Sequence, residues 1–115
     1  MNKRQVGTVY ETKAAEYLSA IGYRILERNF SCRLGEIDII AKEGEYLCFI
    51  EVKFRSGSRF GSPFEAVNYK KQQKIIKVAQ YYMKVHGYAV DSECRFDVVA
   101  VDKTKITLLR NAFGV

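Results

Sequence analysis

The chain has 115 residues, of which 48% are hydrophobic and 28% are charged. That length supplies one compact core, so we expect a single domain over residues 1–115. It is too short for a two-domain dinucleotide-binding enzyme or a (β/α)8 barrel. No apolar run approaches the roughly 18 to 20 residues that cross a bilayer, and none follows the basic residues at the start of the chain. We therefore expect a soluble, cytoplasmic protein with no membrane partner.

The positive charge is concentrated in one part of the sequence. The chain carries 19 Lys and Arg against 13 Asp and Glu, a formal net charge of +6. Residues 53–86 contain eight Lys or Arg and one Glu, a net charge of +7, so the rest of the chain is close to neutral. A localised charge of this kind favours a positive surface that binds a polyanion such as nucleic acid.

The cysteines do not have the spacing of a metal or disulfide site. Cys32, Cys48 and Cys94 are far apart and form no CxxC pair, and the chain has a single histidine, His86. A tetrahedral zinc site is therefore not expected, and we interpret the cysteines as free thiols in a reducing compartment. We interpret His86 as a partner of the dipole at a helix end.

The first predicted elements are a helix and a strand. Apolar residues recur at helical spacing over residues 7–21, and Gly22 suits the position that follows a helix. Residues 23–30 (YRILERNF) have the composition of a strand. The apolar stripe of the helix consists of Tyr10, Ala14, Tyr17, Leu18 and Ile21.

Two further strands are predicted next. Residues 36–42 (EIDIIAK) are rich in isoleucine, and residues 46–54 (YLCFIEVKF) are rich in β-branched and aromatic side chains. A two-residue turn at Glu43 and Gly44 would pair the two strands as an antiparallel hairpin.

A second helix is predicted between Asn68, which suits an N-cap, and Gly87, which suits the position after the helix end. One face is apolar and another is basic, as the periodicity of a helix allows. The apolar face consists of Ile75, Ile76, Ala79, Tyr82 and Met83, and the basic face of Lys70, Lys74, Lys77 and Lys84.

Residues 95–101 (RFDVVAV) and 105–110 are predicted to be the last two strands. A helix between the third and fourth strands implies a crossover connection, which makes neighbouring strands parallel. We therefore predict an α/β fold with a mixed sheet flanked by helices.

The candidate chemistry lies on the predicted hairpin. Glu51 and Lys53 are two residues apart in one strand and therefore share a face of the sheet. With the predicted turn, Asp38 lies opposite Phe49, and Glu51 is one diagonal step away on the same face. Two carboxylates in otherwise apolar strands are costly unless they are neutralised, and Mg²⁺ binds one or two carboxylates while keeping sites for water and phosphate.

Structural roles remain alternatives for each of these residues. Glu51 and Lys53 would also suit the solvated face of an edge strand. The basic face of the second helix would also suit plain exposure to solvent. Glu11, on the first helix, is unremarkable by itself, and Asp97 would suit a structural pair with Arg95.

Four segments of the sequence, in this order, resemble the PD-(D/E)XK nuclease superfamily, and more narrowly the YraN-like family of small bacterial proteins near the archaeal Holliday junction resolvases. They are GxxxE at residues 7–11, GEIDIIA at 35–41, FIEVKFR at 49–55 and RFDVVAV at 95–101. The resemblance covers nearly the whole chain. It implies a restriction-endonuclease-like αβββαβ core.

The resemblance also implies the residues of an active site. Asp38, Glu51 and the carbonyl of Val52 would be ligands of Mg²⁺ or Mn²⁺. Lys53 would be the catalytic lysine, and Glu11 would contribute directly or through water.

Two further positions bear on the resemblance. Gln73 would correspond to the polar residue that resolvase-like members carry on the second core helix. The proline of the superfamily's name is absent, because Ile37 precedes Asp38.

The implied function is hydrolysis of DNA phosphodiester bonds, including branched or junction DNA, with cations holding the flanking phosphates. A homodimer is expected if two strands are cut symmetrically, as resolvases cut them. The alternatives are a catalytically silent nucleic-acid-binding module and a basic protein whose partner is another protein. The candidate phosphate contacts are Arg55, Arg59, Lys70, Lys71, Lys74 and Lys77.

Overall fold

The computed structural model describes residues 3–54 and 67–114 of the chain, and it confirms the predicted α/β fold. The element order is α, β, β, β, α, β, β, which contains the expected αβββαβ core. The elements are α1 (Lys3–Ala20), β1 (Arg24–Cys32), β2 (Gly35–Glu43), β3 (Tyr46–Phe54), α2 (Tyr69–Val85), β4 (Cys94–Val101) and β5 (Ile106–Phe113).

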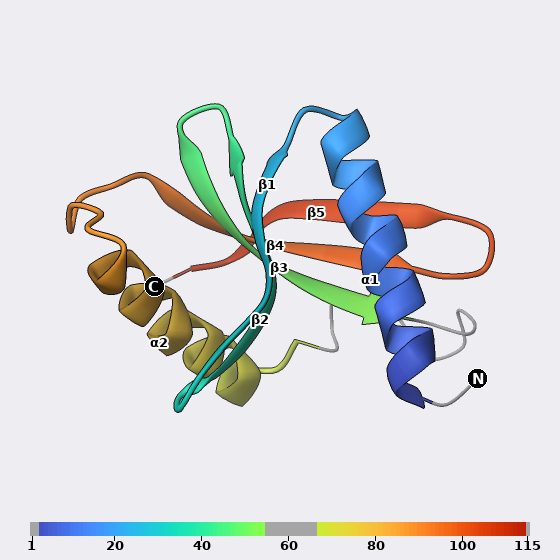
Figure 1. Ribbon diagram of the computed structural model, residues 1–115, viewed down its shortest axis with the longest axis horizontal. Helices are drawn as coiled ribbons and strands as arrows, with labels where there is room; N and C mark the ends of the chain where they lie inside the picture. The colour runs from blue at the N-terminus through green and yellow to red at the C-terminus, as the bar shows by residue number, and fades with distance from the viewer. Residues whose placement is uncertain (1–2, 55–66, 115) are drawn as a thin grey trace.

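The five strands form one mixed sheet in the order β1-β2-β3-β4-β5. β3 and β4 are parallel, whereas the other neighbouring pairs are antiparallel. The parallel pair is the consequence of α2, which carries the chain back between β3 and β4. Figure 1 shows α1 and α2 on opposite sides of the twisted sheet.

Each helix buries its apolar stripe against one face of the sheet, and each fully buried Leu, Ile or Phe stabilises the fold by about 1.5–3 kcal/mol. The core on the α2 side is built around Leu47, Phe49, Ile75, Tyr82 and Phe96. The core on the α1 side is built around Ala14, Leu18, Ile39, Ile50 and Val99.

In the described part of the chain, neither helix is long and apolar enough to cross a membrane.

The predicted ends of α2 are confirmed. The side-chain oxygen of Asn68 accepts a hydrogen bond from the Lys71 N–H at 2.9 Å, as an N-cap does. Gly87 has a φ of 75° immediately after the helix, a conformation that favours glycine. The His86 Nδ1 lies 2.9 Å from the carbonyl of Tyr82 in the last turn, which agrees with its interpretation as a partner of the helix end.

Cys32, Cys48 and Cys94 are free thiols, as the sequence predicted. Two of the candidate phosphate contacts, Arg55 and Arg59, lie outside the described residues.

The predicted register of the β2–β3 hairpin is wrong by two residues. Glu43 pairs with Tyr46, so the turn residues are Gly44 and Glu45. Gly44 has a φ of 59°, and two-residue hairpin turns favour glycine at a first position with positive φ. This turn pairs Ile40, rather than Asp38, with Phe49.

Alternation of the side chains is interrupted within the β1–β2 hairpin. Ile37 packs on the α2 side, whereas Ile39 packs on the α1 side, although residues two apart normally share a face. Opposite them, Asn29 has a φ of 55°, in the left-handed region. The end of the hairpin therefore turns toward α2, while β3 continues under α1 (Figure 1).

Candidate functional site

Asp38 and Glu51 meet where β2 and β3 diverge. The paired part of the hairpin ends at Ile39 and Ile50. Continued by one residue, the same register places Asp38 directly opposite Glu51. The Asp38 carboxylate accepts a hydrogen bond from the Val52 N–H at 2.8 Å, which fixes it beside Glu51. The charge of Glu51 therefore acts on Asp38.

Burial and the charge of Glu51 raise the pKa of Asp38 to about 7. The hydrogen bond from Val52 opposes this rise in part, because it stabilises the ionised form. Asp38 therefore changes its charge near neutral pH. A carboxyl with a raised pKa next to a second carboxylate is typical of a functional site.

Glu51 is held by two lysines. Its side chain is 6% exposed, and its Oε1 lies 3.5 Å from the Nζ of Lys53 and 3.1 Å from the Nζ of Lys71. Lys53 comes from the same face of β3, and Lys71 reaches over from the first turn of α2. From the sequence, Lys53 was predicted to be a catalytic residue, whereas Lys71 was predicted only to contact phosphates.

One signal in the sequence pointed to Lys71. Lys70 and Lys71 open α2, and its first turn has no acidic residue. Cations are disfavoured at the positive N-terminal end of a helix. A lysine pair in this position therefore indicates that a negative charge lies nearby in the fold.

Glu11 extends the acidic region from α1. Among the described residues its Oε1 is buried without a hydrogen-bond partner, and it lies 3.8 Å from the guanidinium of Arg28. Burial raises the pKa of Glu11, and Arg28 opposes the rise in part. Glu11 borders a hollow of about 480 Å³ that is also lined by Glu36 and Asn29. Glu11, Glu36 and Glu51 each add to the negative potential at Asp38.

Gln73 is half-buried on α2. The hydrogen bonds among the described residues include none from Gln73 to Asp38, Glu51 or Glu11. The contact that α2 does make with the carboxylates comes from Lys71, two residues earlier.

The available ligands suit a hard divalent cation that takes few of its ligands from the protein. Asp38 and Glu51 supply two carboxylates, and Mg²⁺ is commonly bound by one or two carboxylates together with water and substrate phosphate. Among residues 7–54 and 67–114 no group of three or more His, Cys, Asp or Glu side chains is arranged around one point. A complete protein cage of the kind that Ca²⁺ or Zn²⁺ uses is therefore not present in that part of the chain.

Asp97 has the structural role that its pairing with Arg95 suggested. It is fully buried in β4 and accepts hydrogen bonds from Arg95, the Tyr23 hydroxyl at 2.8 Å and the Asn111 N–H at 2.9 Å. Asn111 has a φ of 53° where the pairing of β4 and β5 shifts. Asp97 therefore satisfies the backbone of an irregularity in β5.

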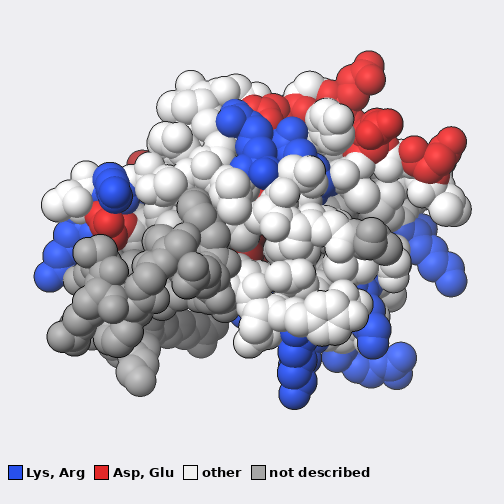
Figure 2. Space-filling view, turned by 180° about the vertical axis from the view of Figure 1, so that it is seen from behind, with Lys and Arg blue, Asp and Glu red and all other residues white. Residues whose placement is uncertain are grey.

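The basic face of α2 points to solvent. Lys70, Lys74, Lys77 and Lys84 are all exposed. In Figure 2 basic side chains project at the lower edge and lower right of the view, where α2 lies, and acidic side chains gather at the upper right. On the face shown in Figure 2, the basic side chains at the lower edge lie apart from the acidic side chains at the upper right.

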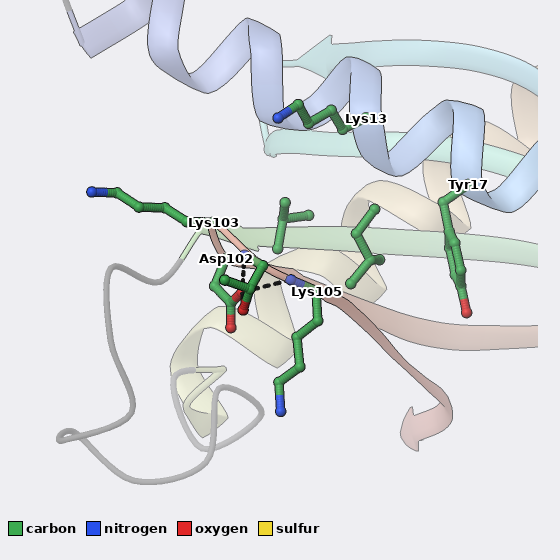
Figure 3. Close-up of a pocket in the computed structure, with 8 residues that line it drawn as sticks. Lys13, Tyr17, Asp102, Lys103 and Lys105 are labelled. Carbon is green, nitrogen blue, oxygen red and sulfur yellow. Dashed lines mark hydrogen bonds between the residues drawn. The ribbon is translucent and has the colours of Figure 1, made fainter.

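A second basic region was not predicted. A hollow of about 370 Å³ between α1 and the β4–β5 turn is lined by Lys13, Lys103 and Lys105. Asp102 lies in the same hollow, and its carboxylate accepts hydrogen bonds from the N–H groups of Thr104 and Lys105. Figure 3 shows the three lysine side chains pointing in different directions. They do not converge on one anion.

Comparison with known proteins gives a consistent match. A family model described as "Uncharacterised protein family UPF0102" matches residues 10–101. A UPF0102 protein of Lachnoclostridium phytofermentans is 50% identical over 98% of this chain and 96% of its own length. A UPF0102 protein of Caldicellulosiruptor bescii is 48% identical over 98% of this chain and all of its own length. One from Moorella thermoacetica is 50% identical over 88% of this chain and 83% of its own length.

Proposed function

Because the chain belongs to the uncharacterised family UPF0102, whose name states no activity, we propose a function from its site: a Mg²⁺-dependent endonuclease that hydrolyses DNA phosphodiester bonds. The resemblance of its four sequence segments to PD-(D/E)XK nucleases supports this proposal. So does the confirmed αβββαβ order.

The observation that carries the proposal is the grouping of Asp38, Glu51 and Lys53 at the point where β2 and β3 diverge. Glu51 acts electrostatically on Asp38, and the Nζ of Lys53 lies 3.5 Å from Oε1 of Glu51. Carboxylates and an ammonium in a partly open site match the needs of phosphodiester hydrolysis, which are a cation, a nucleophilic water and a positive charge near the phosphate.

Each residue has a distinct role in this proposal. Asp38 and Glu51 hold the cation, and Asp38 is oriented for this by the Val52 N–H. Mg²⁺, when bound, would polarise the scissile phosphate and lower the pKa of the attacking water. Lys53 orients that water or stabilises charge on the phosphate, as a point charge can. Glu11, which is not grouped with these two carboxylates around one point, would act from α1 through a water molecule.

The DNA backbone would lie along the basic face of α2, which begins beside Glu51. The exposed Lys70, Lys74 and Lys77 then hold phosphates on either side of the scissile bond. This interaction is independent of base sequence and falls steeply with salt. It suits a substrate that is recognised by shape, such as branched DNA.

A catalytically silent nucleic-acid-binding module is the second candidate, and one observation favours it. Lys53 and Lys71 both pair with Glu51, so this one of the two carboxylates is neutralised without a metal cation.

Titration calorimetry of Mg²⁺ and Mn²⁺ followed by a cleavage assay on branched DNA separates the two candidates. We expect wild type to bind the cation and to cut, leaving 5′-phosphate and 3′-hydroxyl ends. Asp38→Asn should lose cation binding. Lys53→Ala and Glu51→Gln should lose cutting but retain DNA binding. DNA binding by wild type with no cation binding and no cutting would instead establish the silent module.

A further inference from the structure

Lys71 contacts Glu51 although Glu51 already has a partner. Lys53 lies 3.5 Å from Oε1 of Glu51, and Lys71 lies closer to the same oxygen, at 3.1 Å. The side chain of Lys71 is 44% exposed, against 22% for Lys53. Lys71 therefore reaches a buried carboxylate from the surface, while Lys53 belongs to the interior of the site.

Hydrogen bonds hold the backbone of Lys71 in place, whereas its side chain is partly exposed to solvent. The Asn68 side chain holds the Lys71 N–H at 2.9 Å, and the adjacent Gln72 side chain bonds to the carbonyl of Val67. These contacts anchor the first turn of α2. The lysine stem beyond them is long and flexible and carries a single point charge. It can swing from Glu51 toward solvent without any change in the fold.

Such a lysine is poorly explained by stability alone. It stands in the first turn of α2, where the helix dipole disfavours a cation. Its half-exposed ion pair contributes little to folding, typically less than about 1 kcal/mol. A second ammonium at one carboxylate oxygen also repels the first. The placement is better explained by a need for a movable positive charge.

Building on the proposed nuclease function, we infer that Lys71 is an exchangeable counter-ion of Glu51. In the free protein its ammonium neutralises the buried carboxylate. When a divalent cation binds Asp38 and Glu51, the cation takes over that neutralisation and repels the ammonium. Lys71 then swings out to a phosphate of the DNA backbone, so cation binding and DNA binding support each other. Lys71 is thus a positioning residue that couples the two events.

Calorimetric titration with Mn²⁺ and no DNA tests the first half of this inference. Lys71→Met removes the competing charge, so it should bind the cation about three- to tenfold more tightly than wild type. Lys70→Met is the matched control, because it removes the same charge from the neighbouring, exposed position, and its affinity should change less than twofold. Lys71→Arg keeps the charge and should stay close to wild type.

DNA affinity tests the second half, in a Lys53→Ala background that prevents cutting. With Mn²⁺ present, Lys71→Met should weaken binding to branched DNA several-fold. With EDTA in place of Mn²⁺ the same change should have a smaller effect, because Lys71 is then engaged with Glu51. The Lys70→Met control should weaken binding equally with and without the cation.

The outcomes separate this inference from the function on which it rests. Cation binding by wild type that Lys71→Met leaves unchanged or weakens would overturn the exchange and leave the nuclease proposal standing. Absence of cation binding in every variant would remove the nuclease proposal and the exchange together. Lys71→Gln makes the same comparison if circular dichroism shows that the methionine variant is not folded.

Discussion

At the scale of single residues, the buried Asp97 and the half-buried Asp38 meet the cost of burial in different ways. Asp97 is fully satisfied by Arg95, Tyr23 and a backbone N–H, so it remains a structural group. Among the described residues, Asp38 accepts a hydrogen bond from the Val52 N–H, and it faces a second carboxylate. An incompletely compensated acid is poised to bind a proton or a cation, whereas a fully compensated one is not.

The raised pKa of Asp38 predicts an unusual dependence of stability on pH. The folded protein holds the proton of Asp38 up to about pH 7, whereas the unfolded chain loses it near pH 4. The stabilisation is therefore complete below pH 4 and is lost as the pH rises toward 7. Asp38→Asn lacks this loss. Between pH 5.5 and pH 8 the free energy of unfolding should fall in wild type and in the variant by different amounts. The fall in wild type should be larger by on the order of 2 kcal/mol.

Urea denaturation at the two pH values measures this difference, with the exposed Glu45→Gln as a control that should behave as wild type. An equal pH dependence in Asp38→Asn and wild type would show that Asp38 does not carry the raised pKa.

Asp97 should instead behave as a purely structural acid. Asp97→Asn removes the charged partner of Arg95 in β4, although Glu43 still pairs with Arg95. A buried polar group left without its partner costs about 1 to 3 kcal/mol, so we expect a loss of stability of about that size. Asp102→Asn is the control, because its amide oxygen can still accept the hydrogen bonds of the β4–β5 turn. It should therefore destabilise the protein much less than Asp97→Asn. Urea denaturation measures both, and equal costs for the two variants would contradict the role assigned to Asp97.

At the scale of elements, the sequence predicted the identity and order of the helices and strands but not the details of the hairpin. The caps at Asn68 and Gly87 were correctly predicted because each depends on one residue type with a local role. The turn was misplaced because Glu43–Gly44 and Gly44–Glu45 are both chemically acceptable. The two choices differ by two residues in register, so the faces were predicted correctly and the partner of Asp38 was not.

Other features could not be predicted because they depend on tertiary packing. Asn29 in β1 and Asn111 in β5 have left-handed backbone, yet neither residue is a glycine and neither lies in an evident turn sequence. The contact of Lys71 with Glu51 joins residues that are distant in the chain. Only the unfavourable helix position of Lys71 hinted at it.

The observed turn predicts that Gly44 is more costly to replace than Glu45. Gly44 has a φ of 59°, and an alanine in the left-handed region costs about 1 to 2 kcal/mol. Gly44→Ala should therefore lower the free energy of unfolding by about that amount. Glu45→Ala, at the second turn position, should change it by about 0.5 kcal/mol or less. Urea denaturation measures both changes in the free energy of unfolding. A larger loss for Glu45→Ala than for Gly44→Ala would favour a different turn.

At the scale of the whole molecule, the distribution of charge is more informative than its sum. The sequence predicted one basic segment, and the fold presents two basic regions: the exposed lysines of α2 and the hollow between α1 and the β4–β5 turn. The first begins next to Glu51, and the second lies on the α1 side of the sheet. A DNA backbone that passes through the proposed site should therefore depend mainly on α2.

The dependence of DNA affinity on salt distinguishes the two regions. Each phosphate contact that is lost should reduce the slope of log K against log salt by about 0.9 for duplex DNA. Neutralising Lys70, Lys74 and Lys77 to glutamine should thus reduce the slope by about 2 to 3. The same change at Lys13, Lys103 and Lys105 lowers the net charge equally but should reduce the slope by less than about 1. Fluorescence anisotropy between 50 and 200 mM salt measures both variants. Equal reductions would show that binding follows net charge alone, and a larger effect of the second set would place the DNA path over α1.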